Sequence, residues 1–445
     1  MATVSFERYS IPCLASIGKA MRKHKTIVFG MGRSGISALR LLDHLGYETL
    51  AINGPALETW VTEEIKSLSK LQMTEQDFLS FNAQDYLSMV LSPGIPRTHP
   101  VVKKILDQGG EVISEIELGF RYWNGQVMAL TGTNGKTTTV SLLDSIFRHA
   151  DVKVFTGGNI GIPFCDGVLN QLKGADYDLA LLELSSFQLE SMDTFRPHIA
   201  GILNITMSHG ERYPSIEPYR EAKFHLMDNM ESGDVLVCDS KLASDLPQGD
   251  YNLTLIDDQK THSKLLDELQ LPGMHNVLNL IFAESMAAHY GLTVDEMREG
   301  VRNFRGVTHR LERVEVDQVV YNDSKSTNWV ATLTALKAVD KPIQLILGGQ
   351  LRMKDSTGLI DEVLTEIKSK VEKLWLYGEA GDLLAKDLAE FNFEQFKSLD
   401  ELVPKALTEA KAAHLVFSPG FPSFDQFKNF EERGEKFKEL VQRNC

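Results

Sequence analysis

A short loop with two glycines and a lysine holds the residue types that point most clearly to a chemical role. It follows Val127–Thr131, an apolar run that predicts a buried strand, and it precedes Val140–Phe147, which has the character of a helix. The loop consists of Gly132, Thr133, Asn134, Gly135, Lys136, Thr137 and Thr138. Backbone N–H groups of such a loop surround polyphosphate, while the lysine contacts the phosphates and a hydroxyl group binds Mg²⁺. We therefore predict that the chain binds ATP and Mg²⁺.

The loop departs from the general phosphate-loop pattern at its start. That pattern has its first glycine at the position that Leu130 occupies, whereas the first glycine of this chain is Gly132. An ordinary glycine turn that opens a helix is the alternative interpretation. The order of strand, Gly-Lys-Thr and helix favours a shortened nucleotide-binding loop.

Further polar residues follow strands of the same part of the chain. Glu183 ends the apolar run Leu179–Glu183, and a carboxylate there is suited to the Mg²⁺ of a bound nucleotide. A solvent-facing strand end is the alternative interpretation for this residue. His209 follows the run Ile199–Ile205, and Lys223 lies in a helical segment. Taken alone, these two would be an ordinary surface histidine and one of many helix-surface lysines.

A second glycine-rich turn lies near the start of the chain, where Gly30, Gly32 and Gly35 separate a predicted strand from a predicted helix. This spacing is that of a dinucleotide fingerprint, but the next strand ends at Asn53, where the fingerprint has a ribose-binding acid. The missing acid weakens an oxidoreductase interpretation. The helix N-terminus can still bind a diphosphate, and tight packing of the turn is the alternative.

The last part of the chain has two polar segments, 322–328 and 418–434, each at the end of a predicted strand and before a predicted helix. Ligand sites in open α/β sheets favour this edge. Helix capping is the alternative for both segments, because Ser, Asp and Asn also cap helices.

Composition limits the class of protein. The chain has 445 residues, of which 43% are hydrophobic and 24% charged, as is typical of a globular protein with about three domains. Its net charge of −15 argues against binding of nucleic acid. No apolar run has membrane-spanning length, the first residues lack the pattern of a secretion signal, and the four cysteines are scattered. We expect a cytoplasmic protein without membrane insertion.

Strands alternate with amphipathic helices along the whole chain, which predicts an α/β fold with mainly parallel, doubly wound sheets. The predicted parts are an N-terminal extension, 1–24, and a Rossmann-like domain, 25–115. A central domain of the P-loop ATPase type, 116–306, contains the lysine loop. A Rossmann-like C-terminal domain, 307–445, contains the two polar segments.

Together these segments resemble the Mur ligase family from about residue 25 to the C-terminus. The residues that carry the resemblance are 131–138, 183–190, 275–279, 309–310, 322–328 and 423–434. Within the family, Ser185–Glu190 and Phe424–Phe430 are most similar to the branch that adds D-glutamate. The resemblance implies an ADP-forming amide ligase that uses ATP to join D-glutamate to UDP-N-acetylmuramoyl-L-alanine through an acyl phosphate, in peptidoglycan precursor synthesis. For such an enzyme we expect a monomer.

The resemblance also implies roles for individual residues. The implied catalytic residues are Lys136, Glu183, His209 and Lys223, and the implied metal ligands are Thr137, Glu183, His209 and, if carbamylated, Lys223. Besides residues 132–138 of the loop, the implied ATP contacts are Asn276, Asn279, Arg310 and Asp323. The implied UDP-sugar contacts are Gly32, Arg33, Ser34, Ser92, Asn159 and His209. The implied D-glutamate contacts are Lys325, Thr327, Ser423 and Phe430.

Two departures from the family pattern concern the implied site. The family has an aspartate where this chain has Ser208, and an aspartate in its Gly-Gly-Asp-x-Lys segment where this chain has Gln350. Gln350 lacks the negative charge of that acid, and either Arg352 or Lys354 could hold the carboxylate of D-glutamate. The rival interpretations are another Mur ligase or a folylpolyglutamate-synthase-like ligase with a different amino acid, an NTP-dependent switch, and a NAD-linked oxidoreductase.

Overall fold

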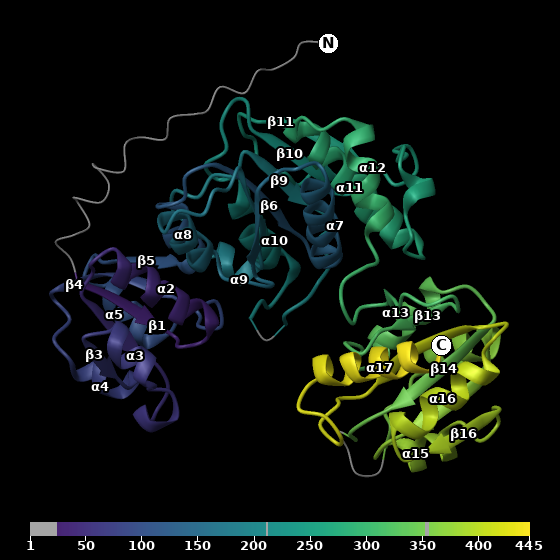
Figure 1. Cartoon of the computed structure of the whole chain (residues 1–445). Coiled ribbons are helices and arrows are strands. Elements are labelled where there is room, and N and C mark those ends of the chain that lie inside the picture. Colours follow the sequence, from purple (N-terminus) through teal and green to yellow (C-terminus); the bar gives the residue numbers. More distant parts are fainter. Residues whose placement is uncertain (1–24, 211, 352–355) are drawn as a thin grey trace. The chain divides into compact units, whose positions relative to one another are not determined.

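The computed structural model describes residues 25–210, 212–351 and 356–445. Figure 1 shows helices and strands alternating along the described chain. The expected α/β fold is confirmed, because the described residues form three sheets whose strands are parallel except at one edge of the third. The chain divides into two compact units. The first unit is Met1–His262 with Ile281–Gly300, and the second is Ser263–Leu280 with Val301–Cys445. The domain boundaries expected near residues 116 and 307 stay predictions, and the extension 1–24, Arg352 and Lys354 lie outside the described residues.

The first sheet has the strand order β3-β2-β1-β4-β5. Its strands are β1 (Lys25–Phe29), β2 (Thr49–Ile52), β3 (Leu71–Met73), β4 (Tyr86–Leu91) and β5 (Glu111–Ser114). The helices of this part are α2 (Arg33–His44), η1 (Leu57–Thr59), α3 (Glu63–Leu68), α4 (Glu75–Ser80), α5 (Pro100–Leu106) and α6 (Glu115–Phe120). Phe29 pairs with Leu91 in the parallel β1–β4 ladder, so the glycine-rich turn after β1 lies beside the residues that follow β4.

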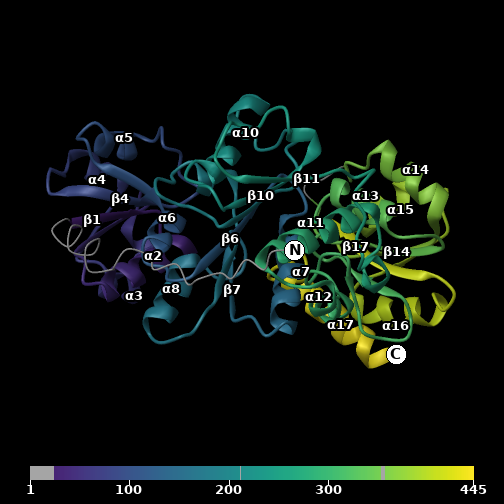
Figure 2. The ribbon, with the colours of Figure 1, turned by 90° about the horizontal axis from the view of Figure 1, so that it is seen from above.

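The second sheet has the strand order β11-β10-β9-β6-β8-β7. Its strands are β6 (Gln126–Thr131), β7 (Val154–Gly158), β8 (Leu179–Glu183), β9 (Ile199–Ile202), β10 (Val235–Asp239) and β11 (Asn252–Ile256). Figure 2 shows β6, β7 and β10 of this sheet from a second direction. Leu130 of β6 pairs with Glu183 on one side and with Gly201 on the other. The lysine loop after β6 therefore lies between the ends of β8 and β9.

The helices between β6 and residue 304 begin with the one that follows the lysine loop, and residues 263–280 among them belong to the second unit. They are α7 (Lys136–His149), α8 (Phe164–Leu172), α9 (Ser186–Leu189), α10 (Ile216–Phe224), η2 (His225–Met227), η3 (Ser240–Leu242), η4 (Leu266–Glu268), α11 (Met274–Tyr290) and α12 (Val294–Asn303). In the part of the chain that the structure describes, no helix combines the length and the apolar character that a membrane span requires.

The third sheet has the strand order β12-β13-β17-β14-β15-β16 and lies in the second unit. Its strands are β12 (Glu312–Arg313), β13 (Val320–Asn322), β14 (Ile343–Gly348), β15 (Val371–Tyr377), β16 (Phe393–Phe396) and β17 (His414–Gly420). Its helices are α13 (Trp329–Ala338), α14 (Asp361–Lys370), α15 (Gly381–Asp387), α16 (Leu399–Glu409) and α17 (Phe430–Asn444). Because β13, β17 and β14 are parallel neighbours, the segments after β13 and β17 meet at one edge of the sheet.

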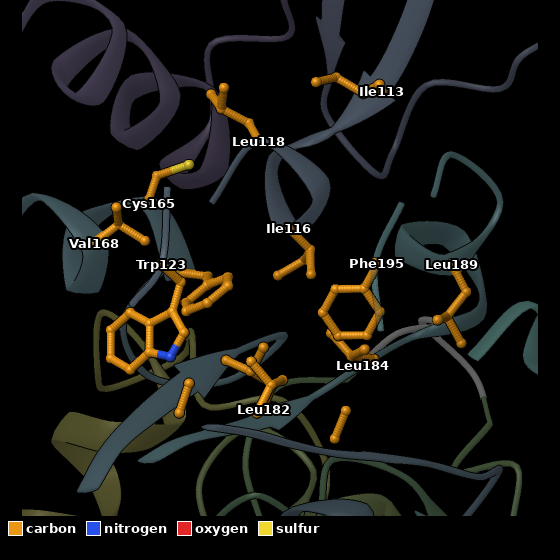
Figure 3. Packing of buried hydrophobic residues seen from close by; sticks show 14 of the residues in the cluster. Ile113, Ile116, Leu118, Trp123, Cys165, Val168, Leu182, Leu184, Leu189 and Phe195 are labelled. Atoms are coloured by element: carbon orange, nitrogen blue, oxygen red, sulfur yellow. The ribbon is translucent and has the colours of Figure 1, made fainter. Parts of the chain in front are cut away.

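One hydrophobic core joins the first two sheets within the first unit. Figure 3 shows Ile116 of α6 among Trp123, Leu182 and Phe195, which belong to the same buried cluster. Burial of such side chains contributes about 25 cal/mol per Å² of apolar surface, so this continuous cluster stabilises both sheets together.

A buried carboxylate strengthens the same junction between the first two sheets. Glu117 of α6 is fully buried and accepts hydrogen bonds from the backbone N–H groups of Asp193, Thr194 and Phe195. Arg121, one helical turn further along the chain, donates to Glu117 Oε1 at 2.8 Å. The charge of Glu117 is thus compensated where α6 meets the segment before β9.

The close approach of α2 to the first turn makes Gly35 sensitive to substitution. A Cβ atom at Gly35 would lie 1.8 Å from the carbonyl oxygen of Gly30, whereas a Cβ at Gly32 meets nothing within 4 Å. We expect Gly35→Ala to lower the free energy of unfolding by about 2 kcal/mol or more, because the turn must move. The matched variant Gly32→Ala should cost less than about 1 kcal/mol. Urea unfolding of both variants tests this, and equal losses would contradict it.

Candidate active site

The lysine loop is shaped by its two glycines and by the segment after β9. Gly132 has a φ of 155°, and Gly135, at the N-terminal cap of α7, has a φ of 84°. Asn204 accepts from the N–H of Thr133 through its backbone oxygen and from the N–H of Asn134 through Oδ1, both at 2.9 Å. These bonds fix the loop at the start of α7, where free N–H groups and the helix dipole attract anions.

Two lysine side chains donate to the same backbone carbonyl in this loop. Lys136 Nζ lies 2.8 Å from Gly132 O, and Lys223 Nζ, from α10, lies 2.9 Å from the same oxygen. Lys223 is buried, and its burial and the charge of Lys136 lower the pKa of Lys223 to about 7, although Glu183 opposes the shift. Two ammonium groups this close repel each other, so the loop favours either a bound anion or a neutral Lys223.

Glu183 at the end of β8 is buried, so the solvent-facing alternative is wrong. Its Oε1 accepts from Asn159 Nδ2 at 2.9 Å. Its Oε2 has no hydrogen-bond partner among the described residues. A buried carboxylate oxygen without a donor is suited to a cation, and Mg²⁺ prefers oxygen ligands.

The other predicted metal ligands are of unusual types for a metal site. Across residues 25–210, 212–351 and 356–445, no three His, Cys, Asp and Glu side chains gather to hold a metal ion. Thr137, in the first turn of α7, is half-buried and offers a hydroxyl oxygen. Lys223 could offer oxygens only as a carbamate, which requires its neutral amine. The oxygen donors Thr137 and Glu183 thus fit Mg²⁺, and the lowered pKa of Lys223 suits its modification.

His209 is exposed on a turn after β9 and has a φ of 57°. Its ring centroid lies 4.8 Å from that of Phe187 and 6.1 Å from that of Tyr219. Lys223 Nζ lies 4.6 Å from the same Tyr219 ring centroid. The structure therefore brings His209 and Lys223 to one aromatic ring beside the lysine loop.

The first glycine-rich turn is held by residues of neighbouring strands. Ser92 Oγ donates to Gly30 O at 2.8 Å, and the N–H of Met31 donates to Asn53 Oδ1 at 3.4 Å. Asn53 occupies the position where a dinucleotide fingerprint has its ribose-binding acid, and in this chain its side chain supports the turn.

The predicted UDP-sugar contacts at this turn lie at the start of α2. Gly32 and Arg33 are exposed, and Ser34 is half-buried. Arg33 Nη2 donates to the carbonyl of Gly161, two residues after Asn159. The turn, Ser92 and the Asn159 segment therefore lie close together within the first unit.

The remaining predicted nucleotide contacts lie in the second unit. Asp323 is buried and accepts from Ser418 Oγ at 2.7 Å and from the N–H of Leu311 at 3.1 Å. Burial raises the pKa of Asp323 to about 7, although these hydrogen bonds and the nearby Arg310 oppose the shift. Asn279 Nδ2 donates to Asn276 Oδ1 at 3.2 Å, and Arg310 is exposed.

The predicted D-glutamate contacts follow β13 and β17. Lys325 Nζ lies 5.6 Å from the ring centroid of Phe430, so the structure brings these two together. Ser423 is buried, and its carbonyl accepts from the N–H groups of Gln426 and Phe427 at 3.2 and 2.9 Å. Thr327 is half-buried in the same loop as Lys325.

Sequence reasoning missed three residues that organise these loops: Asn204, Tyr219 and the buried Arg433. Asn204 carried a signal, because it is a polar residue directly after an apolar strand. Tyr219 carried none, since it lies in a segment with the ordinary composition of a helix. Arg433 lies in the segment 423–434 that carries the family resemblance, but no role was predicted for it.

Comparison with known proteins shows which family the chain is similar to. The models of the Mur ligase middle domain and of the Mur ligase glutamate ligase domain match residues 130–246 and 309–420. The UDP-N-acetylmuramoylalanine--D-glutamate ligase of Alkaliphilus metalliredigens is 34% identical to this chain, over 95% of the chain and 98% of its own length. The chain belongs to the Mur ligase family. The ligase of the same name from Aquifex aeolicus is 35% identical over 94% of this chain and 98% of its own.

Solved Mur ligase structures share the fold of this Mur ligase chain. UDP-N-acetylmuramate-alanine ligase MurC from Thermotoga maritima has a TM-score of 0.52 at 16% identity and covers 95% of this chain and 100% of its own. MurF from Acinetobacter baumannii has a TM-score of 0.54 at 16% identity, over 88% of this chain and 91% of its own. At these identities the likeness concerns the fold alone.

The lowered pKa of Lys223 predicts a pH-dependent stability of this Mur ligase. The pKa of Lys223 is about 7 in the folded chain, whereas that of an ordinary lysine is 10.5. Between these two pH values the unfolded chain therefore binds more protons than the folded chain. The free energy of unfolding of the wild type, minus that of Lys223→Met, should therefore rise from pH 7 to pH 10 by roughly 4 kcal/mol at most. Urea unfolding at several pH values measures this difference. Exposed Lys173→Met is the control, and a pH-independent difference for Lys223→Met would contradict the prediction.

Proposed function

We propose that the chain joins D-glutamate to UDP-N-acetylmuramoyl-L-alanine in an ATP-dependent, ADP-forming reaction of peptidoglycan precursor synthesis. The observation that carries this proposal is that Lys136 and Lys223 both donate to the carbonyl of Gly132. Nearby, Glu183 Oε2 has no hydrogen-bond partner among the described residues. The curated relatives that bear the name of this reaction, along nearly the whole chain, support the choice of substrates.

In the proposed first step the γ-phosphoryl group of ATP moves to the terminal carboxylate of the sugar substrate and forms an acyl phosphate. Lys136 and the N–H groups at the start of α7 offset the charge on the phosphate oxygens during this transfer. Thr137, Glu183, His209 and a carbamylated Lys223 would hold Mg²⁺, which when bound further neutralises the phosphates. In the second step the amine of D-glutamate attacks the acyl carbon, and phosphate leaves as the amide forms.

Each substrate has a proposed group of contacts. The contacts for ATP are Gly132, Thr133, Asn134, Gly135, Lys136, Thr137, Thr138, Asn276, Asn279, Arg310 and Asp323. Those for the UDP-sugar are Gly32, Arg33, Ser34, Ser92, Asn159 and His209, and those for D-glutamate are Lys325, Thr327, Ser423 and Phe430. We further propose that the enzyme acts as a monomer in the cytoplasm, with a first domain ending near residue 115 and a third beginning near residue 307.

The sister activity to distinguish is ligation of a different amino acid or of a folate. Phosphate release should be measured with ATP, UDP-N-acetylmuramoyl-L-alanine and each candidate amino acid in turn. We expect turnover to depend on D-glutamate. Turnover that is equal with and without D-glutamate would reject the proposal, and preference for another acceptor would support the sister activity.

Lys136 should be essential for this reaction. We expect Lys136→Ala to lower turnover about 100-fold to 1000-fold or more, because the transferred charge loses its closest cation. The control is Lys153→Ala, which removes an exposed lysine paired with Asp176. Turnover of Lys136→Ala within about tenfold of the control would contradict a phosphate-binding role for this lysine.

A further inference from the structure

A fully buried arginine lies beneath the proposed D-glutamate contacts. Arg433, in the first turn of α17, has no exposed surface, which is rare for a charged side chain without a functional or structural reason. Its planar guanidinium group donates to three oxygens. Nε lies 3.0 Å from Ser324 Oγ, Nη2 lies 2.7 Å from Ser324 O, and Nη1 lies 2.9 Å from Phe421 O.

The three acceptors belong to two loops that are distant in sequence. Ser324 directly precedes Lys325 in the loop after β13, and Phe421 lies two residues before Ser423 in the segment after β17. Ser324 Oγ in turn donates to the carbonyl of Phe430 at 2.8 Å. Arg433 thus connects the backbones that carry Lys325, Ser423 and Phe430.

A third loop packs against the same guanidinium group. Gly349, which follows β14, approaches so closely that a Cβ there would lie 3.0 Å from Arg433 Nη1 and 2.3 Å from Pro422 O. The N–H of Gln350 donates to Pro422 O at 2.8 Å. The loops after β13, β14 and β17 therefore meet around one side chain, at the sheet edge where α/β proteins bind ligands.

Two titratable groups, Tyr377 and Asp425, lie near the charge of Arg433. Burial raises the pKa of Tyr377, at the end of β15, and the pKa of Asp425, and the positive charge of Arg433 opposes both shifts. Asp425 Oδ2 accepts from the N–H of Glu379 at 3.3 Å, so this acid is turned toward the loop after β15. The guanidinium group of Arg433 donates its hydrogen bonds to the loops after β13 and β17, and these bonds fix its orientation.

We propose that Arg433 is a positioning residue for D-glutamate, which sets the spacing of Lys325, Ser423 and Phe430 by binding the loops after β13 and β17. The inference rests on the proposed function. Lysine cannot replace the arginine here, because an ammonium group is a point donor and cannot span Ser324 and Phe421 in a fixed plane. Misplacement of the loops weakens mainly the contacts to D-glutamate, reaches ATP only through Asp323 beside Ser324, and leaves the lysine loop of the first unit unaltered.

Steady-state kinetics of Arg433→Lys test the proposal in the full-length enzyme. We expect the KM for D-glutamate to rise about tenfold or more and the KM for UDP-N-acetylmuramoyl-L-alanine to stay within about twofold. The KM for ATP should rise by a clearly smaller factor than that for D-glutamate, because only Asp323 among the proposed ATP contacts lies in the loop that Arg433 binds. Ser324→Ala, which removes the hydroxyl link but keeps the arginine, should raise the same KM by a smaller factor. The double variant should be less than additive, because both changes act on one network.

The matched control is Gln344→Met at the other end of the same sheet. Gln344 Oε1 accepts from the buried Trp375 Nε1 at 2.9 Å, so its loss also disturbs a buried hydrogen bond of the second unit. We expect lowered stability in urea and an unchanged KM for D-glutamate. An equal rise of all three KM values in Arg433→Lys, or a rise for D-glutamate in the control as large as in Arg433→Lys, would overturn the proposal.

If Arg433→Lys does not fold, the KM for D-glutamate of Ser324→Ala tests the proposal. An unchanged KM for D-glutamate in Ser324→Ala would then overturn it. The wild type and the variants together distinguish a failure of the proposed function from a failure of the role of Arg433. A wild-type enzyme that turns over without D-glutamate rejects the proposed function, whereas a D-glutamate-dependent wild type with unaffected variants rejects only the role of Arg433.

Discussion

The carbonyl oxygen of Gly132 is the acceptor on which the chemistry of the first unit depends. Lys136 and Lys223 both donate to it, so this buried backbone acceptor keeps a donor if either ammonium group binds elsewhere. Two like charges at one oxygen are unfavourable in a protein interior unless an anion lies nearby or one amine gives up its proton. The two ammonium groups therefore favour an anion such as phosphate beside the loop. Burial and, to a smaller extent, the charge of Lys136 lower the pKa of Lys223, which makes its neutral, nucleophilic amine accessible.

The order of the strands explains why so many polar groups surround that oxygen. Because β6 lies between β8 and β9, the ends of both neighbours open beside the lysine loop, Glu183 on one side and Asn204 on the other. A parallel ladder brings all three carboxyl ends to one edge, where side chains meet without any long insertion. The third sheet repeats the arrangement with β13, β17 and β14, whose loops converge on Arg433 instead of on a backbone oxygen.

Much of the fold and part of the site could be predicted from local patterns. Apolar runs that alternate with amphipathic helices indicated the parallel sheets, and the spacing of Gly132, Gly135 and Lys136 placed the phosphate loop. Burial could not be predicted, because it depends on neighbours that are far away in sequence. Glu183 was compatible with a solvent-facing strand end until its strand partners were known. Arg433 was one basic residue among several in a helix, and only the meeting of distant loops gives it a role.

The continuous core between the first two sheets has a consequence for how the protein is made. Val28 near the start and Leu242 far along the chain belong to one buried cluster. At about 5–20 residues per second, a ribosome needs on the order of 10–40 s between these two positions. During that interval α2 and α6 already cover this face of the first sheet, but the part of the cluster that the second sheet supplies is still incomplete. The early chain therefore exposes the apolar surface that the second sheet later covers, and the speed of translation sets how long it does so.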